Sequence, residues 1–341
     1  MTIPAHRVLL ISTGGTITMT TAADGSISPT LTGDDLARAV PELKERAQLD
    51  VVSYSRLPGA SLTLGNLVDI AGLIDAGFRD GVSGAVVVQG TDTIEETAFV
   101  LDSLVASERP VIITGAMRGA SAPGADGPAN LLAAVTAAVS PSIAGVGTVV
   151  VMNDEIHAAR YVQKSHTSLP SAFMSPGFSP IGRVIEGSAH VYARCAKYAP
   201  LGSPQNVDDV PVALIKVVLG DDGRMLSVLP ELGYRGLVIE AMGVGHLPSH
   251  FADKIERLAK TMPVVLATRI PAGPTFRSTY AFTGSEIDLI ARGAIPGGYL
   301  SGTKACLLLR LLLASGWEGD ELAKEYAARS TAAFLPDRSR A

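Results

Sequence analysis

Two stretches of the sequence have the same form, an aliphatic run followed closely by glycine and threonine. Residues 8–11 precede Thr13-Gly14-Gly15-Thr16, and residues 85–88 precede Gly90-Thr91-Asp92-Thr93. Continuous aliphatic runs are typical of strands that are covered on both faces of a parallel sheet. Because ligands bind beyond the carboxyl ends of such strands, the sequence predicts that the two threonine loops meet at one site.

Strand-like and helix-like segments alternate along the 341 residues of the chain. This alternation predicts an α/β fold, with a larger amino-terminal domain on a doubly wound parallel sheet and a smaller carboxy-terminal α/β domain. The periodicity is lost where proline, asparagine and aspartate accumulate. We therefore expect the first domain over residues 1–199, a linker over residues 200–211 and the second domain over residues 212–341.

Local signals predict how several segments begin and turn. Thr32 precedes Asp35 by three positions and Thr93 precedes Glu96 by three, the spacing of a helix capping box. A cap is therefore a sufficient structural explanation for Thr93. Residues 17–31 are rich in small polar residues, which predicts a mobile loop or a hairpin, with a lid as one interpretation.

Composition excludes several classes of protein. The net charge of −5 offers no basic surface for nucleic acid or anionic lipid. No apolar run approaches the ~20 residues of a membrane span, and the amino terminus has no secretory-signal pattern. Cys195 and Cys306 are far apart, a buried thiol is expected for Cys306, and no metal-binding spacing of histidine and cysteine occurs. We expect a soluble cytoplasmic protein with no metal and no cofactor.

Threonine becomes a nucleophile only when a base takes its proton. Asp92 adjoins Thr91, and Lys164 follows a later strand, so a lysine held by an aspartate is one candidate base. The alternative is a solvated surface lysine, the usual state of this residue type. His157 and His166 are interpreted as structural. Dinucleotide and serine-hydrolase signatures are absent from the sequence.

The sequence resembles the bacterial-type L-asparaginase and glutaminase family. The resemblance is carried by Thr13-Gly14-Gly15-Thr16-Ile17 and Gln89-Gly90-Thr91-Asp92-Thr93, each a signature of that family. It continues through Gly115-Ala116-Met117-Arg118 and Ala125-Asp126-Gly127-Pro128, and reaches the segment around Lys304. Two separated signatures, in order and over nearly the whole chain, make a coincidence implausible.

The resemblance implies hydrolysis of a side-chain amide to a carboxylate and ammonia, by a homotetramer built as a dimer of dimers. It implies that Thr16 is the nucleophile of an acyl-enzyme, and that Thr91, Asp92 and Lys164 activate either this nucleophile or the attacking water. Which threonine attacks first stays open. Backbone amides near Thr91 and Ala116 are candidate oxyanion donors.

Substrate-binding positions are assigned on the same resemblance. The loop Pro58-Gly59-Ala60-Ser61 stands where the family offers Ser-Gln or Ser-Glu to the substrate, so Gly59, Ala60 and Ser61 are expected to bind it with fewer side-chain contacts. Glu286 matches the acidic residue with which a partner subunit meets the substrate ammonium. The alternative for Glu286 is a solvated glutamate in a helix with Asp288.

Two further departures from the family concern the loops around the site. No tyrosine occurs in residues 17–31, where family members commonly carry one, and Gln89 replaces a frequent histidine. L-asparagine is the expected substrate. The alternatives are the same chemistry on another small amide or lactam, and a catalytically weak protein that binds aspartate.

Overall fold

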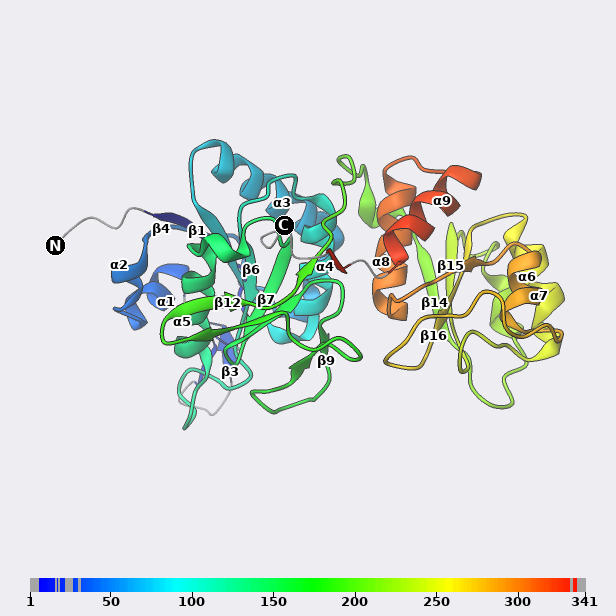
Figure 1. The fold of residues 1–341 in the computed structure, drawn as a ribbon, viewed down its shortest axis with the longest axis horizontal. Helices are drawn as coiled ribbons and strands as arrows, with labels where there is room; N and C mark the ends of the chain where they lie inside the picture. The colour runs from blue at the N-terminus through cyan, green and yellow to red at the C-terminus, as the bar shows by residue number, and fades with distance from the viewer. Residues whose placement is uncertain are drawn as a thin grey trace. The chain divides into compact units, whose positions relative to one another are not determined.

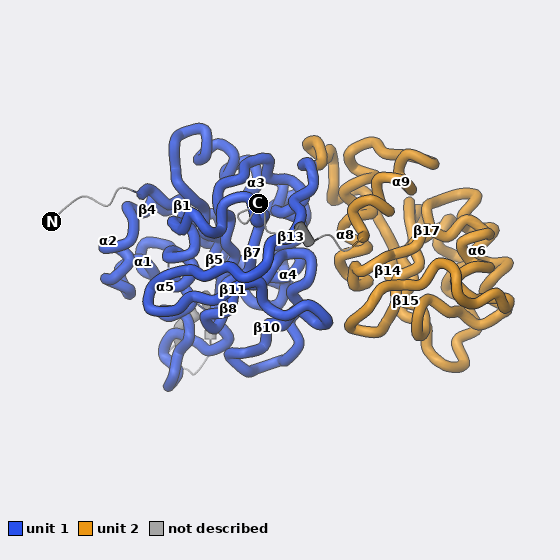
Figure 2. The backbone as a smooth tube through the Cα atoms, in the orientation of Figure 1, with its two compact units in different colours: residues 1–200, 333–341 blue, residues 201–332 orange. Residues whose placement is uncertain are grey.

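The computed structural model describes residues 6–15, 17, 19–21, 27–29, 32–331 and 334–335. Two compact units make up the chain (Figure 2). Unit 1 comprises Met1–Pro200 and Ala333–Ala341, and unit 2 comprises Leu201–Ala332.

Unit 1 holds an eight-stranded sheet, three two-stranded pairings and five α-helices among its described residues. Its strands are β1 (Arg7–Ser12), β2 (Met19–Thr21), β3 (Ile27–Pro29), β4 (Gln48–Ser53), β5 (Gly84–Val88), β6 (Val111–Thr114), β7 (Thr148–Met152), β8 (Glu155–Ala158), β9 (Gln163–Lys164), β10 (Phe173–Met174), β11 (Gly182–Ile185), β12 (Ser188–Val191), β13 (Arg194–Cys195) and β18 (Phe334–Leu335). Its helices are α1 (Gly33–Ala39), α2 (Leu43–Arg46), α3 (Leu64–Arg79), α4 (Ile94–Leu104) and α5 (Gly127–Ala138).

The large sheet has the order β12-β11-β8-β7-β6-β5-β1-β4. The strands from β4 to β7 are parallel, whereas β8, β11 and β12 are joined antiparallel at the other edge. Figure 1 shows β1, β6 and β7 running together in this unit. The chain continues from β1 to β4 on one side of β1 and then to β5 on its other side. The direction of winding therefore reverses beside β1, and α/β sheets bind their ligands at such switch points.

Helices cover both faces of this sheet. Residues of α1, α2 and α5 share one core with Val8, Leu10 and Val86 of the strands. On the opposite face α3 approaches β1, since a Cβ on Gly77 would lie 3.0 Å from Leu9 Cδ2, and α3 packs against α4. The central strands are fully buried, which explains why their sequences are uninterrupted aliphatic runs.

Unit 2 is smaller and has a four-stranded parallel sheet in the order β14-β15-β16-β17. Its elements are β14 (Val212–Lys216), β15 (Gly236–Ala241), α6 (Ala252–Ala259), β16 (Val264–Thr268), α7 (Glu286–Ala291), β17 (Ile295–Pro296), α8 (Gly302–Ala314) and α9 (Gly319–Ser330). A core centred on Leu237, Ile239 and Phe251 lies within this unit. The predicted α/β fold, with a larger parallel-sheet unit and a smaller α/β unit, is confirmed.

Several local predictions can be compared with the elements. The capping box at Thr32 is present, with Asp35 N donating to Thr32 Oγ1 at 3.2 Å. The prediction of a capping box at Thr93 is wrong, because α4 begins after Thr93 without a side-chain cap. β2 and β3 pair antiparallel, which supports the hairpin interpretation of residues 17–31. Cys306 is half-buried, although a buried thiol was expected.

Candidate active site

Thr91, Asp92 and Lys164 come together beyond the carboxyl end of β5. Thr91 and Asp92 lie in η3 (Thr91–Thr93), a 3₁₀ turn between β5 and α4, and Lys164 lies in β9. Lys164 Nζ donates to Thr91 Oγ1 at 2.9 Å and to Asp92 Oδ1 at 2.8 Å. An amine that bridges a hydroxyl and a carboxylate is arranged to transfer a proton between a nucleophile and a leaving group.

The surroundings of Lys164 differ from those of a surface lysine. Its side chain is 17% exposed, and Thr91 is buried. The backbone of Lys164 pairs with Phe173 of β10, whose ring is buried, and Ser165 N donates to Ala172 O at 2.7 Å. A short hairpin thus anchors the lysine so that it points at the threonine loop. The alternative of a solvated lysine does not hold.

Glycines let the two threonine loops and a third loop touch through their backbones. A Cβ on Gly15 would lie 2.1 Å from Gly90 N, and one on Gly90 would lie 2.8 Å from Gly59 N. Gly15 also has a positive φ of 89°, which L side chains rarely adopt. Any side chain at Gly15 would therefore push the first and second threonine loops apart.

Thr16 lies outside the described residues. Its neighbours in the sequence are described on both sides. Gly15 contacts Gly90, and Ile17 is buried beside Gly127, since a Cβ on Gly127 would lie 2.9 Å from Ile17 Cγ1. Thr13, the first residue of the motif, donates its backbone N–H to Val88 O at 3.0 Å and so extends the pairing of β1 with β5.

The loop of residues 58–61 lies against the second threonine loop. Gly59 is buried, whereas Ala60 and Ser61 are exposed. Thr93 Oγ1 donates to Gly59 O at 3.0 Å, which explains why this hydroxyl does not cap α4. The turn η2 (Gly59–Ser61), which holds the three residues predicted to bind substrate, therefore contacts the turn η3 of Thr91 and Asp92.

Ala116 belongs to a loop that also approaches Thr91. It follows β6, and a Cβ on the preceding Gly115 would lie 3.4 Å from Thr91 Cγ2. Ala116 itself is fully buried. The loop therefore packs behind the threonine, and the candidate donors are its backbone groups.

Two residues that position the Ala116 loop were missed by sequence reasoning. Asp126 accepts from Met117 N at 2.9 Å and from Arg118 N at 2.8 Å. Asn130 Nδ2 donates to Gly115 O at 3.0 Å, and its Oδ1 accepts from Asn153 N at 2.9 Å. The available signal was a buried asparagine at the start of an otherwise apolar helix, since such an amide needs partners.

His157 and His166 stand apart from the triad of Thr91, Asp92 and Lys164. His157 is buried, with Nδ1 2.9 Å from Ser175 Oγ. His166 Nδ1 accepts from Ser168 N at 3.1 Å and from Leu169 N at 3.2 Å. Both rings thus organise their own segments, in agreement with the structural interpretation.

Glu286 is the first residue of α7 in unit 2, and it is fully buried. Its Oε1 accepts from Thr279 N at 2.9 Å and from Tyr280 N at 2.7 Å, and its Oε2 lies 3.2 Å from His246 Nε2. Burial raises the pKa of this carboxyl, but the backbone hydrogen bonds outweigh it, so the pKa lies below its usual value. The alternative of a solvated glutamate is therefore wrong.

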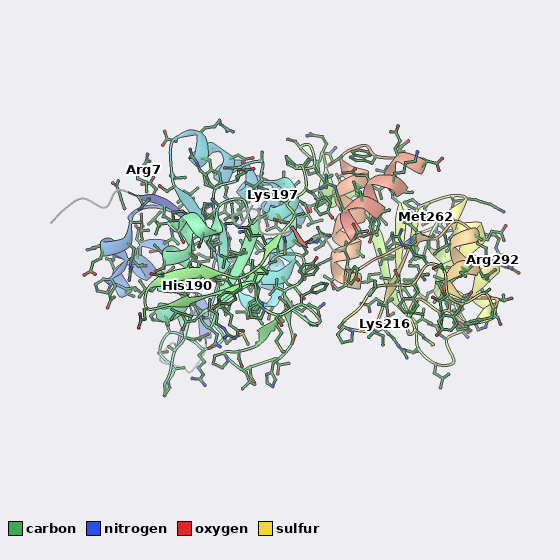
Figure 3. All side chains as sticks on the ribbon, viewed as in Figure 1. Arg7, His190, Lys197, Lys216, Met262 and Arg292 are labelled. Atoms are coloured by element: carbon green, nitrogen blue, oxygen red, sulfur yellow. The ribbon has the colours of Figure 1, made fainter. Side chains whose placement is uncertain are left out.

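The other end of α7 is fixed by ion pairs. Arg292, labelled in Figure 3, follows the helix and pairs with Asp288, Asp253 and Glu256 at 2.9 Å each. Asp253 and Glu256 belong to α6, so Arg292 links the two helices. The carboxylate of Glu286 is thus held on a firmly packed element.

Three other features of the described chain bear on what it can bind. Within the described ranges, no three His, Cys, Asp or Glu side chains gather closely enough to hold a metal ion. A cavity of about 1230 Å³ between α1, α2 and β4 has none of the predicted site residues among its described lining. Of the helices that the structure describes, none is both long and apolar enough to cross a membrane.

Comparisons with known proteins cover nearly the whole chain. The family model "Asparaginase, N-terminal" matches residues 7–197, and "Glutaminase/Asparaginase C-terminal domain" matches residues 211–325. The L-asparaginase of Bacillus licheniformis is 36% identical over 318 residues, which cover 92% of this chain and 97% of that protein. A glutamyl-tRNA(Gln) amidotransferase component from Methanococcus maripaludis is 33% identical over 312 residues, 85% of this chain and 72% of that protein.

A solved structure agrees with these matches. The crystal structure of the probable cytoplasmic L-asparaginase from Campylobacter jejuni is similar with a TM-score of 0.83 at 30% identity, over 95% of this chain and 99% of that chain. Sequence and fold thus point the same way over both units. The chain belongs to the asparaginase family of amidohydrolases.

Proposed function

We propose that the protein hydrolyses the side-chain amide of L-asparagine, giving L-aspartate and ammonia through a threonine-bound acyl-enzyme. The observation that carries the proposal is the bridge that Lys164 makes between Thr91 and Asp92, at 2.9 and 2.8 Å. The name of the relative from Bacillus licheniformis supports the choice of substrate. The proposal calls on no cofactor.

The proposed reaction has two halves. A threonine oxygen attacks the amide carbon, its proton passes to the amide nitrogen, and ammonia leaves from an ester intermediate. Water then attacks the ester, and its proton returns to the threonine oxygen as the carboxylate is released. An amide carbonyl is a weak electrophile, so donors for the developing oxyanion are needed, and we assign them to backbone N–H groups near Thr91 and Ala116.

Within this scheme we assign Thr16 as the acylated nucleophile and the triad of Thr91, Lys164 and Asp92 as the proton-transfer group. Lys164 donates to Thr91, so its ammonium must release a proton before it can act as a base. The contact of Gly15 with Gly90 supports a shared site for the two threonine loops.

Trapping the intermediate tests these assignments. In acid-quenched turnover, peptide mass spectrometry should find an aspartyl ester on the peptide that contains Thr16. Thr16→Ala should abolish the ester, and Thr91→Val should slow turnover by about 100-fold or more, because each removes a member of a coupled site. An ester on Thr91 would reverse the two roles.

The substrate itself is tested by measuring ammonia release from L-asparagine, D-asparagine, L-glutamine and simple primary amides. We expect the highest kcat/KM for L-asparagine. A higher value for a primary amide without an α-amino group would favour the alternative substrate class, which the lack of side-chain contacts at Gly59 and Ala60 makes reasonable. Tight aspartate binding without any ammonia release would favour a binding protein.

We further propose a homotetramer in which Glu286 meets the ammonium group of substrate bound by a second copy of the chain. The carboxylate is covered within its own chain, so this role requires the loop of Thr279 and Tyr280 to move on assembly. Glu286→Gln should then raise KM for L-asparagine and leave hydrolysis of an amide without an amino group unchanged. Light scattering gives the oligomeric state.

The remaining proposals concern organisation and location. We propose a catalytic domain over residues 1–199 and a second domain over residues 212–341, joined by the segment of residues 200–211, close to the division between the two units, which groups residues 333–341 with the first. We also propose a cytoplasmic location, for which the name of the Campylobacter jejuni relative is the support. Activity recovered in the periplasmic fraction of producing cells would contradict it.

A further inference from the structure

Thr93 connects two loops of the candidate active site. Its Oγ1 donates to Gly59 O at 3.0 Å, although the same residue stands at the start of α4, where a threonine hydroxyl usually caps the helix. Of the side-chain hydrogen bonds that the structure describes, only this one joins the loop of residues 58–61 to a residue outside the loop. The other bonds of the loop are its own, from Ser61 N to Pro58 O and from Leu62 N to Gly59 O.

Gln89 fixes the direction of the Thr93 hydroxyl. Gln89 is fully buried, and its Nε2 donates to Thr93 Oγ1 at 3.2 Å and to Gly90 O at 3.3 Å. A hydroxyl has one proton, and Thr93 uses it on Gly59 O, so Oγ1 must accept from its second neighbour. The amide nitrogen of Gln89 therefore faces Thr93, and its Oε1 has no hydrogen-bond partner in the described part of the chain.

A buried amide oxygen without a partner destabilises the fold, so its presence calls for an explanation. A side chain without polar atoms would fill this place at lower free energy. Such a side chain would lack the hydrogen-bond donor that Gln89 offers to Thr93. The geometry therefore indicates that the Gln89–Thr93 hydrogen bond serves the position of the neighbouring loop.

The loop of residues 58–61 depends on the hydrogen bond from Thr93, because it has few polar side-chain atoms with which to bind a substrate. Gly59 and Ala60 carry no polar side-chain atoms, so the position of the loop backbone decides which contacts a substrate meets. Gly59 also packs directly on the threonine loop, since a Cβ there would lie 2.9 Å from Gly90 O and 3.2 Å from Thr93 Oγ1. Thr93 shares the turn η3 with Thr91, which bonds Lys164.

We infer that Gln89 and Thr93 are positioning residues that set the loop of residues 58–61 at its distance from Thr91 and thereby tune the binding of a small amino-acid amide. The inference rests on the proposed function. It assigns the two residues to substrate binding and not to the chemical step, because neither contacts Lys164 or the Thr91 hydroxyl among the described interactions.

The test compares Thr93→Val, which keeps the shape and removes the hydroxyl, with Thr93→Ser, which keeps the hydroxyl. Thr93→Val should raise KM for L-asparagine about tenfold, the effect of one lost hydrogen bond, and leave kcat within about threefold. Thr93→Ser should restore KM to near the wild-type value. Gln89→Met should act in the same direction, and the double variant should be little worse than Thr93→Val alone, because both act through one bond.

The matched control is Thr97→Val. Thr97 lies one turn further along α4, is fully buried and has a hydroxyl without a hydrogen-bond partner in the described chain. Its replacement should leave KM unchanged. A fall in kcat at constant KM in Thr93→Val, or a Thr93→Ser variant as impaired as Thr93→Val, would overturn the inference.

Binding of L-aspartate, measured by calorimetry, separates this inference from the proposed function. Thr93→Val should bind aspartate about tenfold more weakly than the wild type, whether or not the wild type turns over asparagine. A wild-type protein without ammonia release refutes the proposed function alone. Equal aspartate affinity of the wild type and Thr93→Val refutes the positioning role.

Discussion

The two hydrogen bonds of Lys164 differ in how much water reaches them. Thr91 is buried, whereas the side chain of Asp92 is 64% exposed. An ion pair with an exposed carboxylate is screened by solvent and contributes little to stability. The bond to Thr91 lies in the drier surroundings, so under the proposed function we expect the lysine to act most strongly on the threonine and Asp92 mainly to orient the lysine.

This difference predicts an order of effects. Lys164→Met should lower kcat by about 10³-fold or more, since it removes the proton-transfer group, and Asp92→Asn should have a smaller effect because an amide oxygen still accepts from the lysine. Steady-state ammonia release measures both. The control is Lys216→Met in unit 2, labelled in Figure 3, where an exposed lysine pairs with Glu240 at 3.1 Å. Equal losses for Asp92→Asn and Lys164→Met would contradict the order.

A second residue-scale prediction concerns two buried threonines. Thr97 Oγ1 has no hydrogen-bond partner in the described chain, whereas Thr114 Oγ1 donates to Val151 O at 2.8 Å. Thr97→Val should leave the free energy of unfolding unchanged or raise it, because it removes an unsatisfied hydroxyl. Thr114→Val should lower that free energy by about 1 kcal/mol. Urea unfolding of the two variants gives the comparison, and a greater loss in Thr97→Val would be incompatible with it.

At the scale of elements, α1 shows how a short helix begins. Thr32 N donates to Asp35 Oδ2 at 2.8 Å and Asp35 N donates to Thr32 Oγ1 at 3.2 Å, so each residue satisfies the other. The backbone and hydroxyl of Thr32, with Arg38, lower the pKa of Asp35 to about 2. A carboxyl whose pKa is lowered on folding stabilises the fold above its unfolded pKa and loses this effect as the pH falls through its folded pKa.

Thr32→Ala should therefore destabilise the protein by about 1 kcal/mol at neutral pH, the usual effect of a lost helix cap. The difference from the wild type should shrink as the pH falls from about 4 towards 2, because Asp35 is then increasingly protonated in both proteins. Chemical unfolding at several pH values measures this. A difference that stays constant down to pH 2 would show that the carboxylate does not take part in the cap.

Much of the fold could be predicted because its strong signals are local. The aliphatic runs of β1, β5 and β7 and the helical spacing of α3 mark buried elements directly. The antiparallel strands β8, β11 and β12 were not predicted, since each has four residues and an alternation as short as that of Ser188–Val191 does not stand out in the sequence. The cap at Thr93 was mispredicted because its hydroxyl is used by Gly59, 34 positions away.

The candidate site was less accessible to sequence reasoning. The contact between Lys164 and Thr91 spans 73 positions, and no local spacing predicts it. The residues alone offered Lys164 as one candidate base beside a surface lysine, and the resemblance to a family selected it. The loop supports at Asp126 and Asn130 were missed for the same reason, because their partners lie in other loops. Contacts between distant loops are decided by the fold, and a pattern of neighbouring residues does not predict them.

At the scale of the whole molecule, the segment of residues 201–211 is part of unit 2 and packed within it. Leu201, Val207 and Val210 are buried. Arg310 Nη2 donates to Val207 O at 3.1 Å, and Gln205 N donates to Ala314 O at 3.1 Å, so the segment is attached to α8. Its composition resembles that of a linker, but its contacts are those of a folded segment.

Limited proteolysis should reflect this packing. We expect proteinase K to cleave the exposed loop of residues 118–124 before residues 201–211, because cleavage requires local unfolding of the backbone. Fragment masses identify the sites. Early cleavage within residues 201–211 would instead support an open linker, as the composition suggests.

The position of β18 in the sequence has a consequence for folding during synthesis. β13 belongs to the end of the first stretch of unit 1, but its partner β18 comes after all of unit 2, with Arg194 opposite Leu335 and Cys195 opposite Phe334. On the ribosome, β13 of a nascent polypeptide therefore stays unpaired until the codons for residues 334–335 are translated. A transcript truncated within unit 2 would yield a product with this backbone edge open, and such edges are what chaperones and proteases of the quality-control machinery engage.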